Sequence, residues 1–198
     1  MHIRSEQGFS LVEMLLAMAI GSIVMAAIVN MFVNQRKAYA IREQVTEMQQ
    51  NARTGIDYLV RELTMAGYDP AGTSGAGIVA ATANSIQFTM DISKNGVIEA
   101  EENVTFLLYD DGADDDLDLG RRVNGVTELI AENIQALSLR YTLADGTTTD
   151  TPADPSQIRG IDVSLIARTK YSDANFPYNQ GYRNQTLNAS IQVRNMGL

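Results

Sequence analysis

Residues 8–33 read GFSLVEMLLAMAIGSIVMAAIVNMFV, and the rest of the chain is organised around this stretch. After Glu13 no charged residue occurs until Arg36. At about 1.5 Å of rise per helical residue, an apolar run of this length spans the hydrocarbon core of a bilayer, about 30 Å thick. The run therefore predicts a transmembrane helix. Glu13 lies close to its start, and an ionisable side chain in such a position is costly and is a functional candidate by default.

The composition narrows the chemistry that the chain can perform. Its 198 residues include no cysteine and a single histidine, His2. Disulfides and thiol chemistry are therefore excluded. No histidine lies beyond residue 8, so the rest of the chain has no histidine for catalysis or for metal binding. The sequence also lacks a nucleophile elbow and a phosphate-binding glycine loop, so we expect no enzyme. The catalytic alternative is a metal-dependent hydrolase with paired acids such as Asp114 and Asp116.

Negative charge is concentrated in one window of the sequence. Residues 91–118 contain ten acids and one base, Lys94. The net charge of this window therefore equals the formal net charge of the whole chain, -9. A surface of that sign repels nucleic acid and attracts hard cations. We therefore expect the folded domain to bind no nucleic acid.

The helical pattern continues beyond the apolar run. Gly67, followed by Pro70, is typical of a helix C-terminus. The pattern predicts one helix from Phe9 to Ala66, transmembrane over residues 9–35 and amphipathic over residues 36–66, whose apolar stripe packs on a sheet. The stripe consists of Ala38, Ile41, Val45, Met48, Ala52, Ile56, Leu59, Leu63 and Ala66.

Beyond the helix the apolar residues recur with a period of two, which predicts strands. The length suits one anchored helix and one modest domain, here residues 67–198. The fold class is therefore α+β, with a long N-terminal helix packed on an antiparallel β-sheet domain. The predicted strands cover residues 85–90, 104–109, 120–123, 127–130, 137–143, 158–169 and 185–194, and the predicted exposed loops cover residues 144–157 and 171–184.

The leader, residues 1–8, reads MHIRSEQG and is too short and too polar for a secretory signal peptide. The length and hydropathy of the leader and of the apolar run are consistent with a plain uncleaved signal anchor. The segment GFSLVEMLLAM at residues 8–18, however, resembles the processing site of type IV prepilins and of type II secretion pseudopilins.

This resemblance implies cleavage between Gly8 and Phe9 by a prepilin peptidase, and N-methylation of Phe9. It implies that Glu13 aids subunit assembly by pairing with the N-terminal amine of a neighbouring subunit. It also implies the lollipop shape of pilins and a single pass through the inner membrane with a periplasmic C-terminal domain. The alternative for Glu13 is that its carboxylate snorkels to the lipid headgroups.

Later segments resemble PilW-type minor pilins and the related J-type pseudopilins. They are ELTMAGY at residues 62–68, AENIQALSLRY at 131–141 and IRGIDVSLIAR at 158–168. The resemblance implies a minor pilin that helps to initiate type IV pilus assembly and sits in the filament tip complex, with other minor pilins and the major pilin as partners. The alternatives are a J-type pseudopilin of a type II secretion system and a membrane-anchored calcium-dependent adhesion module.

Residues 91–102, DISKNGVIEAEE, fit the spacing of the twelve-residue calcium loop of EF-hands. Gly96 falls where such a loop turns sharply. The flanking segments read as strands, so a hairpin would carry the loop; the alternative is a plain polar turn. The candidate calcium ligands are Asp91, Ser93, Asn95, the Val97 carbonyl, Glu99 through water, and Glu102.

A second acidic run, residues 110–118, has acids at alternating positions but no matching terminal glutamate. We expect this run to be solvated. A second ion, or a contribution to the same ion site, is the alternative.

Overall fold

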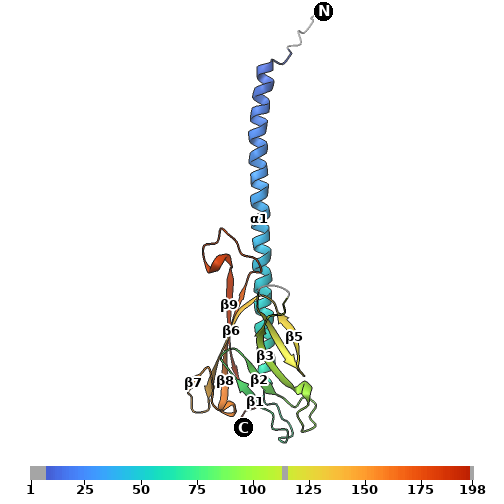
Figure 1. Ribbon diagram of the computed structural model, residues 1–198, viewed down its shortest axis with the longest axis vertical. Helices are drawn as coiled ribbons and strands as arrows, with labels where there is room; N and C mark the ends of the chain where they lie inside the picture. The colour runs from blue at the N-terminus through green and yellow to red at the C-terminus, as the bar shows by residue number, and fades with distance from the viewer. Residues whose placement is uncertain (1–7, 113–115, 197–198) are drawn as a thin grey trace, which may run out of the picture. The chain divides into compact units, whose positions relative to one another are not determined.

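A computed structural model gives the fold and describes residues 8–112 and 116–196 (Figure 1). The chain divides into two compact units, Met1–Glu43 and Gln44–Leu198. One helix, α1 (Leu11–Thr64), contributes residues to both units.

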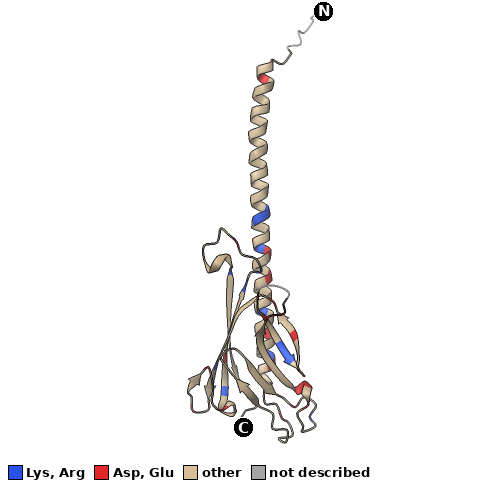
Figure 2. Ribbon diagram, in the orientation of Figure 1, with Lys and Arg blue, Asp and Glu red and all other residues tan. Residues whose placement is uncertain are grey.

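In the first unit, the part of α1 between Glu13 and Arg36 is predominantly apolar on all sides. Between Glu13 and Arg36 its ribbon carries no charged residue (Figure 2). By length and composition α1 is long and apolar enough to cross a membrane. Its large apolar side chains are exposed; Leu15, for example, is 59% exposed and Phe32 58%. An exposed apolar surface of this extent indicates contact with lipid or with another apolar surface.

The helix ends at Thr64, two residues before the predicted end at Ala66. The N–H groups of Met65 and Ala66 bond to carbonyls three residues back, which is the tighter geometry of a closing turn. Gly67 then adopts a φ of +75° and donates its N–H to the Thr89 carbonyl at 2.9 Å. The glycine therefore ends the helix, because its left-handed conformation disfavours other residues.

The second unit contains two antiparallel sheets. The first has five strands in the order β1 (Ile78–Ala81), β2 (Ile86–Thr89), β3 (Asn103–Tyr109), β4 (Asp118–Val123) and β5 (Val126–Ala131). The second has four strands in the order β7 (Thr148–Thr149), β6 (Ile134–Leu143), β8 (Ile158–Arg168) and β9 (Asn184–Gln192). Three short 3-10 helices are η1 (Ala100–Glu102), η2 (Pro155–Gln157) and η3 (Asn179–Gly181). The predicted α+β class, with a long N-terminal helix and antiparallel sheets, is confirmed.

The seven strands predicted from period two are present, with bounds shifted by at most three residues. Two strands were not predicted. β1 has four residues and β7 has two, which is too short for an alternating pattern to stand out. β7 and η2 lie within the segment 144–157 that was predicted as a loop, and η3 lies within 171–184.

The C-terminal part of α1 supplies the side chains that join the two sheets into one core. Leu59 and Leu63 are fully buried in it. A Cβ atom at Gly55 would meet Leu119 of β4, Ala131 of β5 and Leu165 of β8. Both sheets therefore approach α1 at this glycine.

The apolar stripe of α1 was predicted to begin at Ala38, but that residue is exposed. Full burial starts at Met48. Helical periodicity identifies an apolar face, whereas the extent of the sheets decides how much of that face is covered.

Candidate functional site

The first candidate site is the segment in front of α1. Gly8, Phe9 and Ser10 precede the helix, and Phe9 is 91% exposed. The Ser10 N–H donates a hydrogen bond to Glu13 Oε2 at 2.8 Å, and the Glu13 N–H donates one to Ser10 Oγ at 3.2 Å. These reciprocal bonds form a capping box, which satisfies two N–H groups at the helix start.

Glu13 therefore has a local role that the sequence analysis missed. The signal was present, because a serine followed three residues later by a glutamate ahead of an apolar run is the pattern of a capping box. The capping box holds the Glu13 carboxylate at the helix N-terminus, where the helix dipole also favours negative charge. An ionised carboxylate accepts several hydrogen bonds, so it can hold Ser10 and also receive an ammonium group.

The second candidate site is the loop of residues 91–102, which connects β2 to β3 and ends in η1. Asp91 begins the loop and is fully buried. Its Oδ1 accepts the Asn95 N–H at 3.2 Å, and its Oδ2 accepts the Gly96 N–H at 3.0 Å. Gly96 has a φ of +78°, and a Cβ there would lie 2.5 Å from Thr73 Oγ1. The turn at Gly96 therefore excludes larger residues.

Glu102 closes the same loop and is only 4% exposed. Its Oε1 accepts the Ser93 N–H at 2.7 Å, and its Oε2 accepts the Glu99 N–H at 3.1 Å. These backbone hydrogen bonds, first the one from Ser93 and then the one from Glu99, lower the pKa of Glu102. The backbone of the loop is thus wrapped around the carboxylates of Asp91 and Glu102, the acids at its two ends.

The remaining candidate ligands lie in the same hydrogen-bonded loop. Ser93 Oγ lies 3.3 Å from Asp91 Oδ1. The Asn95 side chain donates to Glu99 Oε1 at 3.0 Å and accepts the Val97 N–H at 2.9 Å. Within residues 8–112 and 116–196, no group of three or more His, Cys, Asp or Glu side chains is arranged to hold a metal. A calcium ion here would therefore depend on hydroxyl, amide and carbonyl oxygens as well as on the acids.

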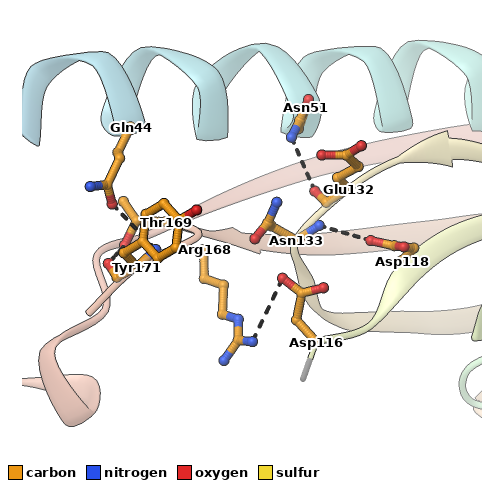
Figure 3. A network of polar contacts seen from close by, with 9 residues as sticks. All are labelled: Gln44, Asn51, Asp116, Asp118, Glu132, Asn133, Arg168, Thr169 and Tyr171. Carbon is orange, nitrogen blue, oxygen red and sulfur yellow. Dashed lines mark hydrogen bonds and ion pairs between the residues drawn. The ribbon is translucent and has the colours of Figure 1, made fainter. Parts of the chain in front are cut away.

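The second acidic run takes part in the packing of the domain, as far as the structure describes it. Asp118 is buried, and its Oδ1 accepts the Asn133 N–H at 3.0 Å. Asp116 Oδ2 lies 3.7 Å from Arg168 Nη2, and its side chain is only 6% exposed (Figure 3). The expectation of a solvated run is therefore wrong for these two acids. Asp114, which the hydrolase alternative would need, lies outside the described residues.

Two polar contacts tie α1 to the loops beside this network (Figure 3). Gln44 Oε1 accepts the Tyr171 N–H at 3.3 Å, and Asn51 Nδ2 donates to the Glu132 carbonyl at 3.2 Å. Asn133 follows Glu132 in a left-handed conformation, with a φ of 59°. These contacts fix the start of the second unit to the β5–β6 turn and to the loop after β8.

A comparison with protein-family models matches residues 3–29 to the prokaryotic N-terminal methylation motif. The matched segment contains Gly8, Phe9 and Glu13. The chain therefore carries a type IV prepilin leader motif, and in this segment it is pilin-like. The motif implies processing by a prepilin peptidase and assembly with other pilins. Together with the apolar part of α1 it fits membrane anchoring and pilus assembly, and it indicates a structural protein and not an enzyme.

Among solved structures, the chain is similar to a type IV-like pilin from Thermus thermophilus. The similarity has a TM-score of 0.47 at 13% sequence identity and covers 75% of this chain and 98% of that one. A comparison with curated proteins gives no match.

Proposed function

We propose that this protein is a minor pilin that helps to initiate type IV pilus assembly and sits in the tip complex of the filament. The observation that carries the proposal is the methylation motif of residues 3–29, which includes the first part of α1 with its exposed apolar side chains. In a filament this part of α1 would pack against the helices of other minor pilins and the major pilin. The β-sheet domain of residues 67–198, here called the β-domain, would lie in the periplasm before assembly.

The proposed mechanism is assembly. Cleavage after Gly8 would leave Phe9 as the first residue, with a free or N-methylated amine. Glu13 would then offer its carboxylate to the amine of a neighbouring subunit, while the capping box with Ser10 keeps that carboxylate at the start of the helix. A carboxylate in lipid needs such a partner, and the ammonium group created by cleavage is a suitable one.

The test combines the mature N-terminus with two variants of the cap. Mass spectrometry of the membrane-extracted protein should show a chain that begins with methylated Phe9. Glu13→Ala should be inserted and cleaved but should be absent from sheared filaments. Ser10→Ala, the matched control, removes the hydroxyl of the capping box and keeps the carboxylate, so it should still enter filaments. Normal incorporation of Glu13→Ala would contradict the proposed role.

Other results would favour the alternatives. An intact Met1 would favour the membrane-anchored calcium-dependent adhesion module. A cleaved chain whose deletion abolishes secretion and leaves pili intact would indicate a J-type pseudopilin of a type II secretion system.

The proposal includes a calcium ion in the loop of residues 91–102. Its support is the twelve-residue spacing, the left-handed turn at Gly96 and the buried carboxylates of Asp91 and Glu102 at the two ends of the loop. The other residues that would hold the ion are Ser93, Asn95, Val97 and Glu99. An ion would offset the repulsion among the acids of residues 91–118 and stabilise the loop.

The calcium prediction is tested by thermal unfolding of the full chain in detergent, with millimolar calcium and with a chelator. Calcium should raise the Tm of the wild-type chain, and Asp91→Asn combined with Glu102→Gln should remove that increase. The control is Glu101→Gln, which removes one negative charge, where the double variant removes two, from an exposed residue of the same loop that the ligand spacing does not use. An unchanged Tm in calcium for the wild type would refute the site.

A further inference from the structure

β9 is an outer strand of the four-stranded sheet and has one free edge. It pairs with β8 in continuous antiparallel register, from Arg168↔Asn184 to Gly160↔Gln192. No strand among the described residues pairs with its other side. An edge of this kind presents a row of unpaired N–H and C=O groups, which is a template for another strand.

The free edge of β9 lacks the features with which proteins usually protect such edges. Its nine residues, NQTLNASIQ, include no charged residue and no proline, and its register shows no bulge. The other outer strands are protected: β1 has four residues and an irregular register, β7 has two residues, and β5 carries Glu128. Short strands, bulges and charges all oppose edge-to-edge pairing. Among the outer strands, β9 therefore has the edge best suited to pairing with another strand.

The side chains of β9 form two rows that an added strand would extend. Asn188, Ser190 and Gln192 are exposed and form a polar row on the outer face. Leu187 and Ala189 lie on the core side but are only half-buried, and both pack against the hydrophobic core. A strand with alternating apolar and polar residues would cover the half-buried row and continue the polar one.

The direction of β9 excludes a second β9 strand as the occupant. β9 begins beside Arg168, close to the loop in which the Tyr171 N–H donates to Gln44 of α1. Three residues after β9 ends, Asn195 donates a hydrogen bond to the Thr64 carbonyl at the end of α1. β9 therefore runs in the same direction as residues 44–64 of α1. Antiparallel pairing of two β9 strands would set their α1 helices in opposite directions, which subunits inserted in one membrane do not permit. Parallel pairing would place the apolar row of one copy beside the polar row of the other.

We propose that the free edge of β9 is a docking site for an extended edge strand of a different pilin subunit. The partner strand runs antiparallel to β9, is uncharged over about nine residues, and alternates apolar residues on the core side with polar residues outside. This inference rests on the proposed function, because it takes its partner from the same filament.

The test places a photo-crosslinking amino acid at Thr186 in the full chain, in cells that assemble filaments. The control places it at Asp162, which is exposed on β8 and away from the free edge. We expect an adduct from Thr186 to an extended segment of another pilin, identified by mass spectrometry, and none from Asp162. Equal adducts from both positions, an adduct to a second copy of the chain, or no adduct from Thr186 in assembled filaments would each overturn the proposal.

Two adjacent proline variants test the backbone contribution. Neighbouring N–H groups of a strand point to opposite edges, so only one of Asn188→Pro and Ala189→Pro removes a hydrogen bond to β8. The other removes only the outward N–H, and thermal unfolding identifies it as the variant that keeps the wild-type Tm. That variant, carrying the Thr186 probe, should show an adduct yield lower by about tenfold, since a partner carbonyl loses its donor. An undiminished yield would refute strand pairing.

The same samples separate the two proposals. A chain that is cleaved after Gly8 and found in filaments, but that gives no Thr186 adduct, would refute the docking edge alone. A chain that is never cleaved or never enters filaments would refute the proposed function.

Discussion

Replacement of Gly55 by valine should destabilise the β-domain, although glycine is a poor helix former. Gly55 is buried in α1 at the point where both sheets approach the helix. A Cβ atom there would lie 2.8 Å from Leu165 Cδ2, 3.2 Å from Leu119 Cδ2 and 3.4 Å from Ala131 Cβ. The first distance requires a shift of the Leu165 side chain, and the two methyl groups of valine add further crowding.

The magnitude follows from two opposing effects. Valine gains about 0.3 kcal/mol over glycine in helix propensity. Overpacking a well-packed core costs about 1–3 kcal/mol, and three added carbons place the cost at the upper end. The net loss of about 3 kcal/mol corresponds to a decrease in Tm of about 6–12 °C for a domain of this size. Gly55→Ala should fall between wild type and Gly55→Val, because one methyl group crowds less and gains about 1 kcal/mol of propensity.

The assay is thermal unfolding of the full chain in detergent, monitored by near-ultraviolet circular dichroism. The chain has 8 tyrosines and no tryptophan, so this signal reports tyrosine packing. Gly21→Val is the matched control: it makes the same change in the same helix, where a Cβ meets nothing within 4 Å. It should leave the Tm of the domain unchanged. A Gly55→Val variant as stable as wild type would refute the packing of both sheets at this position.

Three further predictions concern buried and hydrogen-bonded groups. Tyr141 is fully buried and donates its hydroxyl to the Thr82 carbonyl at 2.7 Å, so Tyr141→Phe should cost about 1–2 kcal/mol in urea unfolding. Burial also raises the pKa of Tyr141 and that of Tyr109, so both tyrosines should ionise at higher pH in the folded chain than in the unfolded chain, as a spectroscopic alkaline titration would show. Hydrogen bonds lower the pKa of Glu102, chiefly from the Ser93 N–H, and that of Asp145, chiefly from the Thr147 side chain. Their contribution to stability is therefore fully present above the unfolded-state pKa values of about 4 and is lost as the pH falls below those values through the lowered folded-state pKa values. The Tm should be constant near neutral pH and should decrease on acidification; a Tm that rises between pH 5 and 3 would contradict these shifts.

The two acidic segments show how sequence and structure divide the information. The spacing of residues 91–102 predicted a turn at Gly96, and the structure places one there because a left-handed backbone beside Thr73 requires glycine. The alternating acids of residues 110–118 gave no sign that Asp118 would be buried against the Asn133 N–H. The partner is 15 residues away in the chain and becomes a neighbour only through the pairing of β4 and β5.

Local pattern alone determined the apolar run after Glu13, the helix that it forms, the stop at Gly67 and the alternation that marks the longer strands. These features depend on residues within a few positions of one another, and helical and strand periodicities are local properties. The Ser10–Glu13 cap belongs to the same group, since its donor and acceptor are three residues apart. The methylation motif is also contained in one continuous segment, residues 3–29.

Tertiary structure decided which apolar positions are covered and which edges stay free. The stripe of α1 is fully buried only from Met48 onward because the sheets cover it only there, and Gly55 is constrained by Leu165, a residue far away in the chain. The free edge of β9 likewise depends on the strand order β7-β6-β8-β9, which no single strand encodes. Strand order and packing arise from contacts between distant segments, whose free energy depends on the whole core and not on local sequence.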